Sequence, residues 1–316
     1  MKTTTFAATV LLAGTFVLSC AAGGASAAEP KKPDAKKPVY DEKADARVEI
    51  EAALKLAKRD NRRVLIQWGA NWCGLCVRLD ERFRTDPDLK KTLTYEYIVV
   101  HVDIDGGKKN VDLYHHYKMP PSMPSLTVLD AAGEVIAGQA AGGLLVTTSE
   151  EGEQYDAKQL QEFLTAHKAE PLNADTVLDA ALLEAAKTER GVLLHFGAPW
   201  CGWCLRMDDW LARPRVAEII GKDFVDLKID LDGMTGAKEL LAHYKGNNQG
   251  GIPWFVLLDA NGKAVVTSDG PQGNIGFPAT DLEIDHFVTM LRAAQRRLST
   301  AEIDELRRSL TPPAKE

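Results

Sequence analysis

The chain has 316 residues, of which 45% are apolar and 26% are charged. This composition is globular, and the length is sufficient for two ordinary domains that each have a core. The formal net charge of −7 excludes a protein built to bind nucleic acid, because such proteins need clustered Lys and Arg.

Residues 1–27 have the pattern of an export signal. Lys2 supplies a short positive region, and residues 6–18 form an uncharged apolar stretch that is too short to span a bilayer. We therefore expect the mature protein in the periplasm or at the outer face of a cell envelope. Cys20 ends Val17-Leu18-Ser19-Cys20, which resembles a bacterial lipobox, and it is our candidate for lipidation. The alternative is ordinary cleavage after Ala27.

The chain that follows predicts a flexible tether and then an alternation of helices and strands. Residues 28–43 are rich in Pro and Lys, which indicates a solvated segment. In the helix predicted next, Val48, Ala52, Leu54, Leu56 and Ala57 are the apolar positions. The predicted elements are, in order, a helix at 44–61, a strand at 64–68, a helix from Cys73 to a stop at 85–87, a strand at 97–105, a helix at 111–118, a hairpin of 125–129 with 134–137, and a helix at 156–169.

The same order then begins again, which indicates an internal duplication. Residues 64–83 and 192–211 are identical at ten of twenty positions. We predict the domains as 44–170 and 171–316, because Pro171 ends one helix and Asn173 or Asp175 is suited to cap the next. The second half adds a helix at 174–188, a strand at 192–196, a loop at 267–278, a helix at 282–298, and a final helix that a cap at Ser299 starts and Leu310 ends.

Each half carries a Trp-Cys-Gly-x-Cys motif between a strand and a helix. A cysteine at a helix start gains from free N–H groups and the helix dipole, which favour its thiolate. Cys73 and Cys201 are therefore the candidate nucleophiles, and Cys76 and Cys204, one turn later, are the candidates to resolve a mixed disulfide. A permanent disulfide would be a poor staple across so short a loop. Zinc is the other alternative, but zinc modules place their two cysteine pairs much closer together.

The motifs and two distant prolines carry a resemblance to thioredoxin-fold proteins. Pro124 and Pro253 lie 48 and 49 residues beyond the second motif cysteine, each before a strand. The resemblance implies an α/β fold of two tandem thioredoxin-like domains, each a central mixed sheet flanked by helices. It also implies that both prolines are cis and face the disulfide, with Met123 and Ile252 beside them in contact with substrate. Cell-envelope thiol:disulfide interchange proteins share this organisation.

Two departures from the family concern the buried acid and an aromatic residue before the motif. Gln67 and His195 stand where the resemblance implies the acid that helps the second cysteine lose its proton, and Gly69 and Gly197 stand where it implies an aromatic residue. His195 is suited either to accept that proton or to be a neutral core histidine bonded to backbone. Gln67 cannot accept a proton, so we expect the second centre to be the more active one.

Other residues near the motifs tune the site or pack against it. We interpret Gly74 and Gly202 as permitting a tight turn into the helix, and Leu75 and Trp203 as setting thiolate stability. The tryptophans Trp72, Trp200 and Trp203 fit either an apolar docking face or half-buried packing. Two further acids recur seven residues after each first cysteine, and we interpret them as a solvated acidic patch: Asp80 and Asp208.

The sequence thus predicts a protein-disulfide oxidoreductase, with reductase or isomerase activity favoured. The expected partners are cysteine-containing exported proteins and a membrane or soluble redox partner, with membrane attachment through a lipidated Cys20. No cofactor, metal or nucleic acid is expected. The alternative function is a non-catalytic peptide-binding or scaffolding protein on the same fold.

Overall fold

The computed structural model describes residues 38–120, 122–148 and 152–310. The export signal, Cys20 and most of the predicted tether lie outside the described residues. No helix in these ranges is apolar and long enough to cross a membrane.

The first half is built on a four-stranded mixed sheet of order β2-β1-β3-β4. The central strand β1 runs parallel to β2 and antiparallel to β3, and β4 pairs antiparallel with β3. Its elements are α1 (Ala46–Asp60), β1 (Arg63–Gly69), α2 (Gly74–Thr85), α3 (Pro87–Glu96), β2 (Tyr97–Asp103), α4 (Val111–His116), β3 (Ser125–Leu129), β4 (Val135–Ala140), a 3-10 turn (Ala141–Leu144), β5 (Leu145–Thr148), β6 (Gly152–Tyr155) and α5 (Ala157–Ala166).

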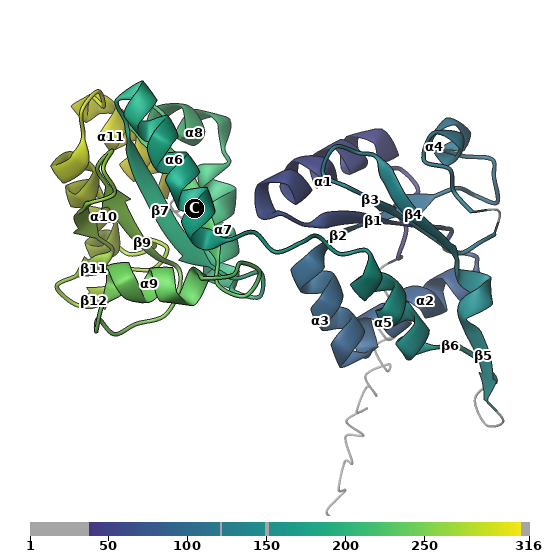
Figure 1. Ribbon diagram of the computed structural model, residues 1–316. Helices are drawn as coiled ribbons and strands as arrows, with labels where there is room; N and C mark the ends of the chain where they lie inside the picture. Colours follow the sequence, from purple (N-terminus) through teal and green to yellow (C-terminus); the bar gives the residue numbers. More distant parts are fainter. Residues whose placement is uncertain (1–37, 121, 149–151, 311–316) are drawn as a thin grey trace, which may run out of the picture. The chain divides into compact units, whose positions relative to one another are not determined.

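The two faces of this sheet have separate cores, because its central strand is buried on both sides. One core joins α1 and α4 to the sheet through residues such as Ile50 and Trp68. The other joins α2, α3 and α5 through residues such as Leu79 and Leu160. Figure 1 shows α1 on one face of the sheet and α3 and α5 on the other.

The second half repeats the sheet with strand order β8-β7-β9-β10, and again the first two strands pair in parallel. Its elements are α6 (Ala174–Thr188), β7 (Gly191–Gly197), α7 (Gly202–Leu211), α8 (Pro214–Ile220), β8 (Phe224–Asp230), α9 (Ala237–Lys245), β9 (Trp254–Leu258), β10 (Ala264–Thr267), β11 (Asp269–Gly270), β12 (Gly273–Asn274), α10 (Asp281–Ala294) and α11 (Thr300–Leu310).

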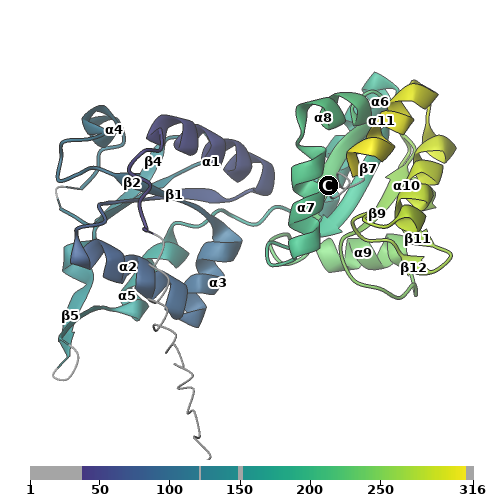
Figure 2. The same ribbon diagram turned by 180° about the vertical axis from the view of Figure 1, so that it is seen from behind.

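Among the described residues, the second half has one more α-helix than the first, α11, which enlarges one of its two cores. Figure 2 shows α10 and α11 side by side, and their apolar residues join those of α7 and α8 in one cluster. The loop before α11 is fixed by Asp223, whose carboxylate accepts hydrogen bonds from three successive backbone N–H groups at 296–298. Ser299 caps α11 as predicted, and it exchanges hydrogen bonds with Glu302.

The α/β fold and its duplication are confirmed. Helix α2 ends at Thr85, two residues before Pro87, as predicted. Asn173 is the residue that caps α6, through the N–H of Thr176. The sequence did not predict α3 or the β5–β6 hairpin, although Asp86 caps α3 and Pro87 opens it, which is the usual start of a helix.

Two predictions in the first half were wrong. The buried face of α1 consists of Ala46, Ile50, Ala53 and Ala57, whereas Val48 is 61% exposed. The small side chains repeat every three or four residues and let the helix approach the sheet closely. The tether prediction also extended too far, because Tyr40 lies within it and is completely buried.

Candidate active sites

The turn between strand and helix places the first cysteine of each motif at a helix start. β1 ends at Gly69, and Cys73 is the residue that caps α2, with the N–H of Cys76 lying 3.2 Å from its sulfur. Cys201 caps α7 in the same way, again with 3.2 Å between its sulfur and the Cys204 N–H. A thiolate at this position is stabilised by the hydrogen bond and by the positive end of the helix.

Each motif forms a disulfide, with Cα atoms 5.2 Å apart in both pairs. The two cysteines of a pair are both buried and differ slightly in exposure. Cys73 is 8% exposed and Cys76 is fully buried, while Cys201 is 6% exposed and Cys204 is 2% exposed. The first cysteine of each pair is thus the more exposed one, and the roles of nucleophile and resolving residue stay predictions.

Both prolines that the resemblance singled out follow cis peptide bonds, Met123–Pro124 and Ile252–Pro253. The residues before them reach the disulfides. Met123 packs against the cluster that Cys73 and Cys76 form with Tyr40, and the carbonyl oxygen of Ile252 lies 3.6 Å from the Cys201 sulfur. The contact with substrate predicted for these residues stays a prediction.

The tryptophans beside the cysteines are more exposed than half-buried packing would require. Trp72 and Trp200 are 63% and 59% exposed, and their indole N–H groups donate to Asp105 and Asp232. Trp203 stacks on Phe277 with 6.3 Å between ring centroids, and Arg206 lies over both rings. The rings are thus held in place while one surface stays open to solvent. Their use in docking remains a prediction.

The interpretation of Gly74 and Gly202 as turn residues was wrong. A Cβ on either glycine would meet no atom within 4 Å, and neither has a positive φ angle. Gly69 is the glycine that the first site needs. A Cβ there would lie 2.2 Å from the hydroxyl oxygen of Tyr40 and 3.0 Å from Cys76 Cβ.

Tyr40 is the residue of this site that sequence reasoning missed. Its hydroxyl accepts a hydrogen bond from Gln67 Nε2 at 3.0 Å, and the same nitrogen donates to the carbonyl of Cys76 at 3.3 Å. Gln67 and Tyr40 are both fully buried. The available signal was Gly69 itself, since a glycine where the family has an aromatic residue leaves room for a ring from elsewhere.

At the β7 position that corresponds to Gln67, the environment is charged. His195 is 4% exposed, and its Nδ1 lies 3.9 Å from Asp208 Oδ1. Its Nε2 lies 3.1 Å from Asp226 Oδ1, although the ring is not oriented for a hydrogen bond. Lys228 Nζ lies 2.6 Å from Asp208 Oδ2. His195 is therefore a buried histidine as predicted, but its neighbours are carboxylates rather than backbone carbonyls.

Asp80 and Asp208 do not form a solvated acidic patch, and that interpretation was wrong. They are 7% and 5% exposed, because each lies on the helix face that packs against its sheet. The partners of Asp80 are Arg84 at 2.7 Å and His101 at 3.3 Å. Burial opposes ionisation of Asp80, but the hydrogen bonds and charges of His101 and Arg84 outweigh it and lower its pKa. Each helix thus carries a buried acid one turn beyond its second cysteine.

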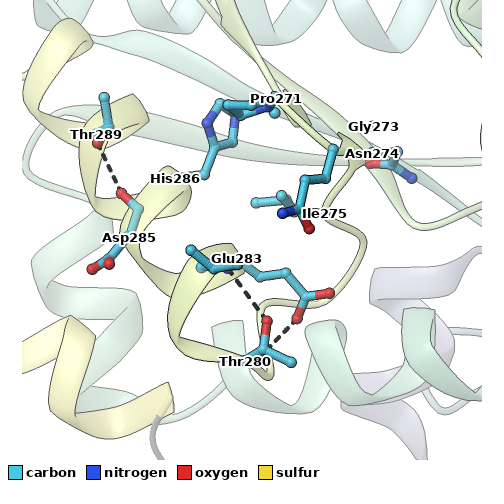
Figure 3. Close-up of a pocket in the computed structure, with 12 residues that line it drawn as sticks. Pro271, Gly273, Asn274, Ile275, Thr280, Glu283, Asp285, His286 and Thr289 are labelled. Carbon is cyan, nitrogen blue, oxygen red and sulfur yellow. Dashed lines mark hydrogen bonds between the residues drawn. The ribbon is translucent and has the colours of Figure 1, made fainter.

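A pocket of about 460 Å³ lies in the second half between the β11–β12 hairpin and α10 (Figure 3). Neither cysteine of the second motif lines this pocket. The Glu283 carboxylate in its wall caps α10 with Thr280, and His286 Nε2 lies 3.1 Å from the Thr267 carbonyl oxygen. Asn274 joins the pocket to the active site, because its side-chain amide donates to the carbonyl oxygens of Gly251 and Pro253.

Within 38–120, 122–148 and 152–310, no group of three or more His, Cys, Asp or Glu side chains is arranged to hold a metal ion. The four motif sulfurs are bonded in pairs. Paired sulfurs whose first cysteine caps a helix support thiol–disulfide exchange, because the helix start favours the thiolate.

A mixed sheet with a CxxC disulfide at a helix start and a cis proline beside it defines a thioredoxin-like domain, and this chain has two. Family models agree. Residues 45–131 match a family described as thioredoxin-like, and residues 156–305 match one described as a protein of unknown function, DUF255. The chain is therefore a tandem protein of the thioredoxin-like class, to which the disulfide oxidoreductases belong.

Individual relatives fall in the same class. Protein disulfide-isomerase 1 of Dictyostelium discoideum is 26% identical over 212 residues, which are 64% of this chain and 54% of that protein. The chain thus matches about half the length of this curated relative. A disulphide isomerase structure from Xylella fastidiosa is 26% identical, with 42% of this chain and 98% of that one covered and a TM-score of 0.36. A Thermus thermophilus thioredoxin is 21% identical, with coverage of 37% and 82% and a TM-score of 0.28.

Proposed function

We propose that this protein is a thiol:disulfide oxidoreductase of the bacterial cell envelope that exchanges disulfides with exported proteins through two CxxC centres. The observation that carries the proposal is the repeated geometry. In each half the first cysteine caps a helix, the less exposed second cysteine lies one turn later, and the residue before a cis proline packs against the cluster that holds the pair. The export-signal pattern of residues 1–27 supports a location in the periplasm or at the outer face of the envelope.

The reaction begins with the reduced pair. The Cys73 or Cys201 thiolate attacks one sulfur of a substrate disulfide, so a mixed disulfide forms and the other substrate sulfur leaves as a thiolate with the electron pair. The Cys76 or Cys204 thiolate then attacks the first cysteine. That step closes the motif disulfide and releases the second substrate thiolate. The substrate gains two electrons and the motif loses two.

The structure contains the oxidised end of this cycle in both centres. A reductase must then be returned to its dithiol form by a membrane or soluble dithiol partner, because the envelope is an oxidising compartment. An isomerase releases a rearranged substrate from the mixed disulfide and needs no net supply of electrons. Both activities use the same attack by Cys73 or Cys201, and lipidation at Cys20 would hold either at a membrane.

The test compares the purified protein with a Cys73→Ser, Cys201→Ser double variant. We expect reduction and reshuffling of disulfides in a model substrate to fall by more than about a thousandfold, because both nucleophiles are removed. Serine is itself a good helix cap, so the variant should keep its fold, which circular dichroism checks. An unchanged rate in the folded variant would contradict the proposal.

One observation favours a second function for the first half alone. Gln67 is a neutral amide at the position of the family's acid, so the first pair lacks a strand residue able to take a proton from Cys76. The first domain would then bind or orient peptides while the second catalyses. Rapid alkylation of thiols in intact cells tests this: a first pair that is always oxidised and never in mixed disulfides would support scaffolding.

A further inference from the structure

A short segment ahead of the first domain reaches the first redox centre and fills space behind it. Tyr40 lies 33 residues before Cys73 in the sequence, yet it forms a buried cluster with Cys73 and Cys76. Its backbone is clamped on both sides by Asn71, which accepts from the Tyr40 N–H at 3.0 Å and donates to its carbonyl at 2.9 Å. The position of the ring is thus set by the loop that precedes the motif.

The Tyr40 ring and the Cys76 side chain border the same space. The point where a Cβ on Gly69 would stand is 2.2 Å from the Tyr40 hydroxyl oxygen and 3.0 Å from Cys76 Cβ. At the corresponding glycine of the second half, Gly197, that point is 3.1 Å from Cys204 Cβ, and no tyrosine is near it. The tyrosine therefore belongs to the first centre alone.

The hydrogen bonds of Gln67 determine whether the Tyr40 hydroxyl group can act as a donor. The carbonyl of Cys76 only accepts, so the end of the Gln67 amide that faces it is the nitrogen, and this nitrogen also donates to Tyr40. The hydroxyl oxygen is thus an acceptor in that bond. Among the described residues, no acceptor, the Cys76 sulfur of the disulfide included, receives the hydroxyl proton of Tyr40, so this proton is available to a Cys76 thiolate of the same cluster.

We propose that Tyr40 is a catalytic hydrogen-bond donor of the first centre, which stabilises the Cys76 thiolate and so speeds its attack on the mixed disulfide at Cys73. The inference rests on the function proposed above. In this step Cys76 loses its proton to solvent and its sulfur bonds to Cys73. The bond from Cys73 to the substrate sulfur breaks, and the substrate leaves as a thiolate with the electron pair.

The groups that face Tyr40 keep it in the donor form. Burial raises its pKa, and the carboxylates of Asp80 and Asp103 raise it further, against the opposing hydrogen bond from Gln67. The His101 ring meets the Tyr40 ring edge-on at 5.6 Å, with Asp80 and then Arg84 behind it. Tyr155 is the remaining titratable group that acts on it. Tyr40 thus stays protonated at physiological pH.

The experiment isolates the first centre in the full chain by Cys201→Ser and Cys204→Ser. The reduced protein is mixed with an aryl disulfide, 5,5′-dithiobis(2-nitrobenzoate), whose thiol product absorbs light. Attack by Cys73 releases one aryl thiol, and resolution by Cys76 releases the second, so stopped-flow absorbance separates the two steps. The rate of the second step against pH reports the pKa of Cys76.

In the Tyr40→Phe variant of this parent we expect the second step to slow about tenfold near pH 7, with its pH midpoint raised by about one unit. The first step should keep its rate. Tyr97→Phe is the matched control, since it also removes a buried tyrosine hydroxyl with a hydrogen bond, to Leu164, away from the cysteines. A second step in Tyr40→Phe that matches the parent or this control would overturn the inference.

A second variant keeps the hydroxyl but moves it. Gly69→Ala should displace the ring and slow the second step as Tyr40→Phe does. If Gly69→Ala, folded by circular dichroism, resolves at the parental rate, the inference is again overturned. The first step separates this outcome from a failure of the proposed function: a parent that releases neither thiol contradicts both, whereas a parent that releases both, with unchanged variants, contradicts Tyr40 alone.

Discussion

The two redox centres share their geometry but differ in what lies behind the buried sulfur. In both, the motif cysteines have Cα atoms 5.2 Å apart, and a backbone N–H lies 3.2 Å from the first sulfur. Behind Cys76 are a neutral amide and a phenol, Gln67 and Tyr40. At the position on β7 that corresponds to Gln67 is a histidine with carboxylate neighbours, His195.

This difference shows that the geometry and the environment of a CxxC pair have separate origins. The geometry follows from a local rule, in which a strand leads through a short turn to a helix whose cap is a cysteine. The environment comes from side chains that are distant in sequence. Duplication therefore copies the disulfide and leaves each centre free to acquire its own means of handling the proton of the second cysteine.

The largest effect on turnover is expected for variants in which only one of the two centres is intact. We expect the protein with only the second pair, made by Cys73→Ser and Cys76→Ser, to retain most of the turnover. The protein with only the first pair should retain a minor share, because Gln67 cannot accept a proton. Turnover of a model disulfide substrate measures this. Equal rates, or a faster first centre, would contradict the contrast between the centres.

The next largest effect is expected for the candidate base of the second centre, His195. His195→Gln gives the second centre the amide of the first but no tyrosine, so we expect resolution by Cys204 to slow by roughly a hundredfold. The rate of the second thiol release against pH is the measurement. His243→Gln on the exposed surface of α9 serves as control. A rate in His195→Gln equal to that of the control would mean that His195 only packs.

Alanine variants of two glycines, Gly69 and Gly74, test whether Tyr40 packs behind the first centre. Gly69→Ala drives a methyl group into Tyr40 and should lower the free energy of unfolding of the first domain by about 2 kcal/mol. Gly74→Ala meets open space at a helix start and should leave stability unchanged or raise it by about 0.5 kcal/mol. Denaturant unfolding of the full chain compares them. Equal stabilities would show that Tyr40 does not occupy the space behind Gly69.

The smallest effect is that of the buried acid on α2. The pKa of Asp80 is lowered from 3.8 in the folded protein, so its ion pairs stabilise the fold above that pH and are lost as the pH falls below it. Asp80→Asn should therefore cost about 1.5 kcal/mol near pH 7. The gap between variant and wild type should narrow below pH 3.8. A gap that does not change with pH would contradict the ionised state of Asp80.

The sequence was sufficient for the fold and for the reactive atoms because their signals are local or repeated. The motifs, their distance to Pro124 and Pro253, and the identity between the halves predicted both disulfides and both cis prolines. Strand and helix bounds followed from apolar runs and caps. The sequence also indicated where α3 begins, although this helix was not predicted, since a proline that ends one helix is well suited to start another.

The environment of each centre could not be predicted from the sequence, because it depends on contacts between distant residues. Nothing in a Pro- and Lys-rich segment indicates that Tyr40 folds back onto Cys76, other than the missing side chain at Gly69. Burial of Asp80 and Asp208 depends on the rotation of each helix against its sheet, and on partners at the facing strand positions, the His101 ring and the Lys228 ammonium group. The charge of the two aspartates, taken alone, favoured a position on the solvated surface.

The central claim, that both pairs exchange disulfides with protein substrates, is tested most directly by trapping. Cys76→Ser and Cys204→Ser remove the two resolving sulfurs, so mixed disulfides should accumulate at Cys73 and Cys201. Each variant is expressed in cells, thiol–disulfide exchange is stopped by acid quench, and free thiols are then alkylated before non-reducing electrophoresis. The account predicts substrate adducts with each variant that disappear when the first cysteine is also replaced. Both variants free of adducts, with the wild-type pairs permanently oxidised, would contradict it.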